Sequence, residues 1–156
     1  MAEGEFARAR GYLEIALSKT ATWIGEHDLY AMLADAAAQQ RDAAALEQYA
    51  PVAEELAARY DHKLYQAIAH RAWGVAHRLG GRGDDARVRL RRALELFETL
   101  DTRWQIGRTL FELGELALSQ TENEVAREHF SRALAAFEEM GALPDAMRTR
   151  EKLAGS

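Results

Sequence analysis

The chain has 156 residues, 48% of them hydrophobic, and its 25 acidic and 20 basic residues give a formal net charge of −5. Length and apolar content predict one folded domain rather than a disordered chain, and the mixed charge gives no sign of a nucleic-acid or anionic-membrane partner. With no cysteine and no apolar run long enough for a signal peptide or a membrane span, we expect a cytoplasmic protein without disulfides or thiolate zinc sites.

Apolar residues recur at intervals of three and four along the whole chain, a pattern typical of amphipathic helices. The composition agrees, since Ala, Leu, Glu and Arg dominate and β-branched runs are absent. Helices are predicted near residues 5–19, 26–40, 43–59, 62–79, 84–100, 103–119, 122–140 and 144–153, with no strand. Pro51 falls inside the third helix and predicts a kink or a break there.

The expected helix ends follow from capping residues. Asp42 is the expected N-cap of the third helix, and Asp84 or Asp85 that of the fifth. Thr121 with Glu124 has the spacing of a capping box before the seventh helix, which Gly141 should close.

One segment is written twice: "DDARVRLRRALELFETLD" (84–101) returns forty residues later as "EVAREHFSRALAAFEEMG" (124–141). A shift of forty superposes Gly74 on Gly114, Ala86 on Ala126, Ala93 on Ala133 and Phe97 on Phe137. A fainter copy places Ala34, Leu46 and Ala53 forty residues before the first set. Each repeat holds two helices, and because one hairpin cannot bury both of its apolar faces, the copies should stack into a continuous core.

We therefore divide the chain into one helical-repeat domain, 1–156, with repeats at 21–60, 61–100 and 101–140 and a C-terminal helix at 141–156. Residues 1–20 form an orphan second helix, because Ala9, Leu13, Ala16 and Leu17 repeat the spacing of Ala86, Leu90, Ala93 and Leu94. Its stripe of Phe6, Leu13, Ala16 and Leu17 lacks a partner. We expect it either to pair with a second copy across a two-fold axis, as a homodimer, or to be covered by residues of a longer protein.

The repeat resembles the tetratricopeptide repeat family, whose pattern is a small residue late in the first helix, then alanine, a large apolar residue and alanine in the second. The matching residues are Gly74, Ala86, Leu90, Ala93 and again Gly114, Ala126, Phe130, Ala133. The period of forty exceeds the family's usual value of about 34, and is similar to repeats in large bacterial signal-transducing ATPases, transcriptional activators and nucleotide cyclases. The resemblance implies an all-α, right-handed superhelical solenoid of antiparallel helical hairpins.

The resemblance also implies a binding module rather than an enzyme, with the first helices lining a concave face. Transferring the family's groove positions gives these candidate peptide-binding residues: Arg71, Val75, Arg78, Arg108, Phe111, Glu115, Leu118 and Arg148. Guanidinium groups beside Phe111 and Leu118 would suit an acidic peptide with an apolar anchor, although ordinary solvated arginines would give the same pattern. The expected function is a non-catalytic scaffold or adaptor. The alternative is a ligand-sensing or interdomain regulatory segment of a larger signalling protein or transcriptional regulator.

Other patterns carry no chemistry of their own. His70 and His77 share a helix face but lie about 10 Å apart along the axis, too far to share one metal ion. "GGRGDD" (80–85) joins two helices without a preceding strand, so it is a turn rather than a phosphate loop. The carboxylate pairs Glu112/Glu115 and Glu95/Glu98 and the basic run "RVRLRR" (87–92) are typical of solvated helix surfaces. We predict no catalytic residues, no metal and no cofactor.

Overall fold

In a computed structural model of the chain, residues 2–18 and 25–155 are described; they form eight α-helices and no strand. The helices are α1 (Ala2–Ser18), α2 (Glu26–Gln40), α3 (Ala43–Arg59), α4 (Lys63–Leu79), α5 (Gly83–Thr99), α6 (Arg103–Ser119), α7 (Asn123–Glu139) and α8 (Leu143–Gly155). The all-α prediction is confirmed, and the predicted helix ends differ from these by at most three residues.

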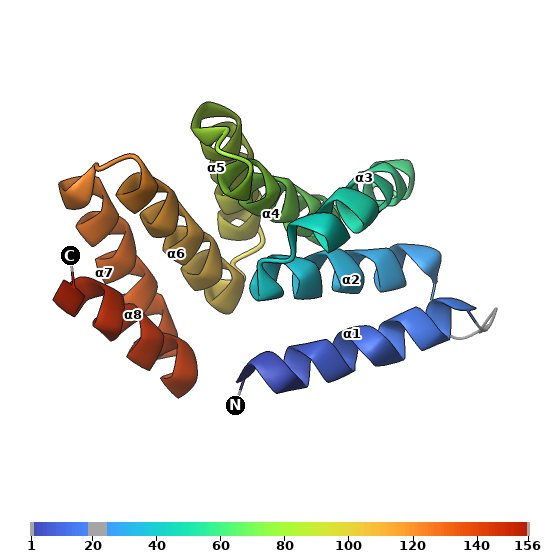
Figure 1. The fold of residues 1–156 in the computed structure, drawn as a ribbon, viewed down its shortest axis with the longest axis horizontal. Helices are drawn as coiled ribbons and strands as arrows, with labels where there is room; N and C mark the ends of the chain where they lie inside the picture. Colours follow the sequence, from blue (N-terminus) through green and yellow to red (C-terminus); the bar gives the residue numbers. More distant parts are fainter. Residues whose placement is uncertain (1, 19–24, 156) are drawn as a thin grey trace.

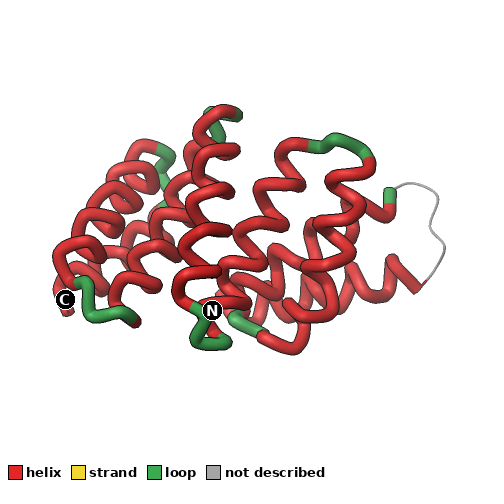
Figure 2. Tube along the Cα trace, turned by 90° about the horizontal axis from the view of Figure 1, so that it is seen from above, coloured by secondary structure: helices red, strands yellow, loops and turns green. Residues whose placement is uncertain are grey.

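Each helix packs against the next one in the chain, and α2 also packs against α4. The helices follow an arc, with α2, α4 and α6 on its inner side and α3, α5 and α7 on its outer side (Figure 1). Short loops join the successive helices from α2 to α8, as the view from above shows (Figure 2). None of the helices in the described part of the chain is long and apolar enough to cross a membrane.

The turns between helices repeat one backbone conformation every twenty residues. Positive φ angles occur at positions 41, 61, 81, 101, 121 and 141, between +48° and +73°. At each of them the next backbone N–H returns to a carbonyl five residues earlier, as from Glu122 to the oxygen of Ala117 at 2.9 Å. This left-handed turn satisfies the carbonyl groups that the end of a helix leaves open.

This turn corrects two of the predicted caps. Thr121 takes the left-handed position that ends α6, with φ of 60°, so it cannot cap α7; Glu122 is the N-cap residue there, without a side-chain cap bond. Asp84 and Asp85 lie in the first turn of α5 instead of capping it, and the N-cap residue is Arg82. The cap at Asp42 is confirmed, since its side chain accepts a hydrogen bond from Ala45 N at 3.0 Å.

Pro51 does not divide the third helix, so the prediction of a break is wrong. Helix α3 runs without interruption from Ala43 to Arg59 and Pro51 is exposed. On the exposed side of a helix, the carbonyl that proline leaves without a donor can be solvated, which reduces the cost of the missing bond.

Small residues that recur with the repeat allow the helices of the core to pack closely. A Cβ atom added to Gly114 would lie 2.6 Å from the Phe130 ring, and one added to Gly74 would lie 2.5 Å from Leu90. The two helices of a hairpin therefore approach so closely that no larger residue fits at these positions without a shift. The repeated alanines of the second helices, at positions 86, 93, 126 and 133, are completely buried.

Helix α1 makes one contact that a second helix of the repeat also makes. Arg10 Nη1 lies 2.5 Å from Oδ2 of Asp42, the N-cap residue of α3. Arg87, the equivalent of Arg10 in α5, makes the same kind of contact to Glu122, the N-cap residue of α7, at 2.9 Å. Of the predicted apolar stripe, Phe6 and Leu13 are half-buried, while the side chains of Ala16 and Leu17 lie outside the described set.

Candidate functional site

The first-helix face, as we name the surface where α2, α4, α6 and α8 meet around Asp35, Arg71, Arg108 and Glu115, carries most of the residues predicted to bind a peptide. A cavity between the four helices is lined by Ala38, Gln39, Arg41, Arg71, Val75, Arg108, Glu112 and Arg148. Its volume is about 20 Å³, little more than one water molecule occupies. The structure thus brings Arg71, Val75, Arg108 and Arg148 together, but side chains fill most of the space between them.

Asp35 of α2 holds the centre of this face. Its Oδ1 lies 2.7 Å from Nη2 of Arg71 on α4 and 3.0 Å from Nη2 of Arg108 on α6. Arg108 also donates to Oδ2 at 3.0 Å, so it binds the carboxylate with both of its terminal nitrogens. Such two-point guanidinium–carboxylate contacts fix geometry as well as charge. One carboxylate therefore ties together the first helices of three successive hairpins.

The buried charges shift the pKa values of this cluster. Burial alone would raise the pKa of Asp35, but the guanidinium groups of Arg108 and Arg71 outweigh it and hold that pKa well below its ordinary value. Burial, together with the charge of Arg108, lowers the pKa of Arg71 to about 10. Arg71 is 1% exposed, yet Arg71 and Asp35 both stay ionised at neutral pH.

Two further carboxylates complete the network. Arg78 Nη2 lies 3.0 Å from Glu112 Oε2, with both side chains nearly buried. Glu115, whose side chain is also largely buried, faces Arg41 at 3.4 Å and Lys152 at 2.6 Å. The predicted site residues Arg78 and Glu115 are thus present at this face, each engaged in an ion pair within the chain.

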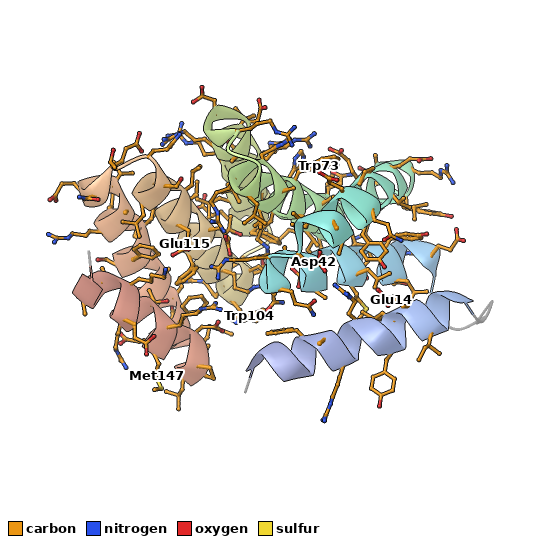
Figure 3. All side chains as sticks on the ribbon, viewed as in Figure 1. Glu14, Asp42, Trp73, Trp104, Glu115 and Met147 are labelled. Atoms are coloured by element: carbon orange, nitrogen blue, oxygen red, sulfur yellow. The ribbon has the colours of Figure 1, made fainter. Side chains whose placement is uncertain are left out.

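Aromatic rings sit beneath two of the arginines. The Arg148 guanidinium lies 4.6 Å from the centroid of Phe111, and that of Arg108 lies 4.7 Å from the centroid of Trp104. Asp145 links the two stacks, since it accepts a hydrogen bond from Trp104 Nε1 at 2.9 Å and one from Arg148 Nη2 at 3.0 Å. Figure 3 shows Trp104 between α6 and α8.

The expected apolar anchors are differently placed. Phe111 is 1% exposed and packs edge-on against Phe130, with ring centroids 5.3 Å apart. Leu118 is half-buried and packs against the core of α5 to α8. Trp104, 37% exposed, is the large aromatic ring that solvent reaches here. Trp104 was not among the predicted site residues, although its spacing of four residues from Arg108, which places neighbouring side chains on one helix face, could have pointed to it.

The sequence also gave no reason to select Glu112, Arg41 and Lys152 for this face. Glu112 and Glu115 are not the solvated pair that their spacing suggested, because each neutralises a cation from another helix or from the turn after α2. Pairing between helices far apart in the chain leaves no local pattern, so only the fold could reveal it.

The remaining patterns are ordinary contacts. His70 Nδ1 lies 3.1 Å from Arg89 Nη1, and His77 stacks on Trp73 with centroids 5.4 Å apart. No three His, Asp or Glu side chains in the described part of the chain gather as a metal would require. The basic run of α5 is paired with acids: Arg87 with Glu122, Arg89 with Glu54 and Arg92 with Glu95.

The helical hairpins repeat every forty residues and stack on one another. Small residues lie at their closest contacts, and polar side chains gather on the first helices. A known family of helical repeats shares these features. Residues 65–139 match the tetratricopeptide repeat family. The matched segment covers α4 to α7 almost completely, which includes the two clearest copies of the repeat. Tetratricopeptide repeats generally bind proteins or peptides and are typically non-catalytic. No curated protein sequence and no solved structure matches the chain significantly.

Proposed function

We propose that the first-helix face binds an acidic segment of a partner protein and that the chain acts as a non-catalytic scaffold or adaptor. The observation that carries this proposal is a charge imbalance. Six basic side chains, Arg41, Arg71, Arg78, Arg108, Arg148 and Lys152, share the four carboxylates of Asp35, Glu112, Glu115 and Asp145. This positive surplus stands on a chain whose formal net charge is −5, so it favours a negatively charged partner.

The exposure of these groups suggests how a partner would meet them. Arg41, Arg148 and Lys152 are 38%, 48% and 39% exposed, so a ligand carboxylate can reach them from solvent. Arg71, Val75 and Arg108 are buried beneath them and line the same cavity. Trp104 offers the apolar anchor that sequence reasoning assigned to Phe111 and Leu118.

Unsatisfied donors lend further support. The buried Nε atoms of Arg71 and Arg78 have no hydrogen-bond partner, although both side chains are otherwise paired. A buried donor without an acceptor costs about 1–3 kcal/mol. The small cavity that Arg71 lines has room for one water molecule, and a water held there under a bound partner would relieve part of that cost.

Selection from a random peptide library on the immobilised 156-residue chain tests the proposal. The recovered peptides should be enriched in Asp and Glu with one large apolar residue. Their affinity should fall as salt is raised, because the exposed contacts are screened. Arg148→Glu should weaken the best peptide at least tenfold, or about 1.4 kcal/mol.

Arg92→Glu supplies the matched control. Arg92 is an exposed arginine of α5, a second helix, paired with Glu95, so its reversal changes the net charge equally without touching the first-helix face. Recovered peptides rich in Lys and Arg, or an equal loss of affinity in the two variants, would contradict the proposal.

A further inference from the structure

A groove between α5, α6 and α7 lies apart from the first-helix face. Helix α6 packs on both α5 and α7, and the groove opens where the ends of α5 and α7 approach the start of α6. Its volume is about 400 Å³, within the range of pockets that take a ligand. The residues that line it differ from those that line the cavity on the first-helix face. We name it the α5–α7 groove.

The floor of the α5–α7 groove is apolar and comes from two helices. Leu110 of α6 is 2% exposed, and Ile106, one turn earlier on the same helix, is half-buried. Ala136 of α7, which lines the groove with them, is also half-buried. Solvent thus reaches apolar side chains here, and such a surface is one that the side chain of a partner can cover.

The preceding hairpin shows why this groove is open. A shift of forty residues aligns Ala136 with Leu96 of α5. Leu96 is half-buried and packs against a core cluster that includes Ile68 and Phe97. Ala136 offers only a methyl group in place of that side chain, so the corresponding space beside α6 is left to solvent. A leucine side chain from another protein has the size and shape to restore the contact.

The same shift exchanges polar side chains for apolar ones. Arg89 of α5 pairs with Glu54 of α3 and lies 3.1 Å from His70 of α4. Forty residues later, Leu94 and Leu110 stand at the positions of Glu54 and His70. Neither leucine can pair with a charged or polar group, so the floor of the α5–α7 groove favours an apolar occupant.

Charged side chains form the rim of the groove. Arg103 Nε lies 2.9 Å from Asp101 Oδ1, and Arg103 Nη1 lies 3.1 Å from Glu139 Oε2. Arg132 Nη2 lies 3.5 Å from Glu98 Oε1. All five side chains are at least 47% exposed, and such exposed pairs rearrange at little cost. Three carboxylates against two guanidinium groups leave a negative surplus, opposite in sign to that of the first-helix face.

We propose that the α5–α7 groove is a second docking site, which takes a leucine-sized aliphatic side chain from a basic segment of a partner protein. The apolar floor receives the leucine, and the surplus carboxylate of the rim attracts the flanking lysine or arginine. This inference goes beyond the acidic partner proposed for the first-helix face. Two sites of opposite charge preference would allow the chain to hold two different partners at once.

The test is a titration of the 156-residue chain, with labelled methyl groups, by the peptide Lys-Lys-Leu-Lys-Lys, followed by NMR. The methyl signals of Ile106 and Leu110 should shift, while those of Val75 on the first-helix face stay in place. The peptides Lys-Lys-Ala-Lys-Lys and Glu-Glu-Leu-Glu-Glu should each bind there about tenfold more weakly, because one lacks the apolar side chain and the other has the wrong charge.

Ala136→Leu supplies the side chain that Leu96 supplies in the preceding hairpin, so it should fill the groove and weaken the basic peptide about tenfold. Urea unfolding should show this variant to be at least as stable as the parent. Ala44→Leu is the matched control, because Ala44 is exposed on α3 and the same atoms are added away from the groove. It should bind as the parent does.

Glu139→Lys tests the rim separately and keeps the proposal testable if Ala136→Leu does not fold. It should weaken the basic peptide, while Glu47→Lys, the same change at an exposed residue of α3, should not. Unchanged binding by Ala136→Leu or Glu139→Lys overturns the inference, as does equal binding of the leucine and alanine peptides. Shifts of Ile106 and Leu110 that follow protein concentration without peptide would assign the groove to a second copy, which also overturns it. An acidic peptide that shifts Val75 while the basic peptide shifts nothing would overturn this inference alone and leave the proposed function intact.

Discussion

Asp35 shows at the scale of single residues how the chain keeps two guanidinium groups in its interior. Arg71 and Arg108 are 1% and 6% exposed, and both reach the same carboxylate. Two cations beside one anion leave a net positive charge there, which the fold tolerates because all four terminal guanidinium nitrogens have hydrogen-bond partners. Removing one member of such a cluster leaves charges buried without compensation.

We therefore expect Asp35→Asn to destabilise the fold by about 3–5 kcal/mol at pH 7. The pKa of Asp35 is lowered in the folded state from its ordinary 3.8, so its contribution is present above that pH and is lost as the pH falls through the lowered pKa. Urea unfolding at pH 7 and near pH 2 measures both effects. The difference between parent and variant should shrink at the lower pH.

Glu47→Gln removes an exposed carboxylate of α3 and should leave stability within about 0.5 kcal/mol of the parent. Equal losses in Asp35→Asn and Glu47→Gln would show that Asp35 is not the central pairing group.

His70 is a second residue whose protonation state matters to the fold. Arg89 can only donate, so His70 Nδ1 must accept at 3.1 Å and the ring must be neutral. Burial lowers the pKa of His70, and Arg89 and Arg92 lower it further, while Glu54 opposes them. Burial also lowers the pKa values of His77 and His129.

Because these folded-state pKa values lie below the unfolded value of 6.5, stability is complete above that pH and declines as pH falls through the lowered values. The free energy of unfolding should therefore decrease from pH 7.5 to pH 5. His70→Gln keeps an acceptor for Arg89 but does not titrate, so its decrease should be shallower. A variant with the same pH dependence as the parent would remove His70 from this account.

At the scale of the helix pair, one hairpin is held by a few large side chains set against small ones. Phe130 and Phe137 of α7 are completely buried and their rings lie over Gly114 and Gly107 of α6, where an added Cβ would come within 2.6 Å and 2.8 Å. The close approach of the helices depends on that pairing of sizes, so changes in either direction are costly.

Two substitutions in α7 test this packing from opposite sides. Phe130→Ala should cost about 3–5 kcal/mol, because it leaves a cavity beneath Gly114. Ala133→Leu should cost about 1–3 kcal/mol, because Ala133 is completely buried and the extra methyl groups must push α7 away. Chemical unfolding of both variants measures these losses, and two variants as stable as the parent would mean that the hairpin register is wrong.

At the scale of the whole molecule, neighbouring hairpins share a continuous core, while the first helices are also tied by charge. Asp35 and Arg108 are 73 residues apart in the chain, and their contact spans from α2 to α6. Helices α4 and α6 touch each other only slightly, and the contacts of Asp35 with Arg71 and Arg108 join α2, α4 and α6 on the inner side of the arc (Figure 1). The charged residues that we propose to meet a partner thus also set the shape of the face they form.

The helices, their number in the described ranges and the repeat could be predicted from the sequence, because apolar spacing and recurring small residues are local signals. The prediction that Thr121 caps α7 was wrong, because a local pattern does not show which residue the turn uses. Thr121 instead adopts the left-handed conformation that ends α6. The site was predictable only in outline. Sequence periodicity placed Arg71, Arg78, Arg108 and Arg148 on first helices, but it could not assign Asp35 to Arg71 and Arg108, or Glu115 to Arg41 and Lys152. Those pairs join helices distant in the chain, and only the stacking of the hairpins brings their charges within reach.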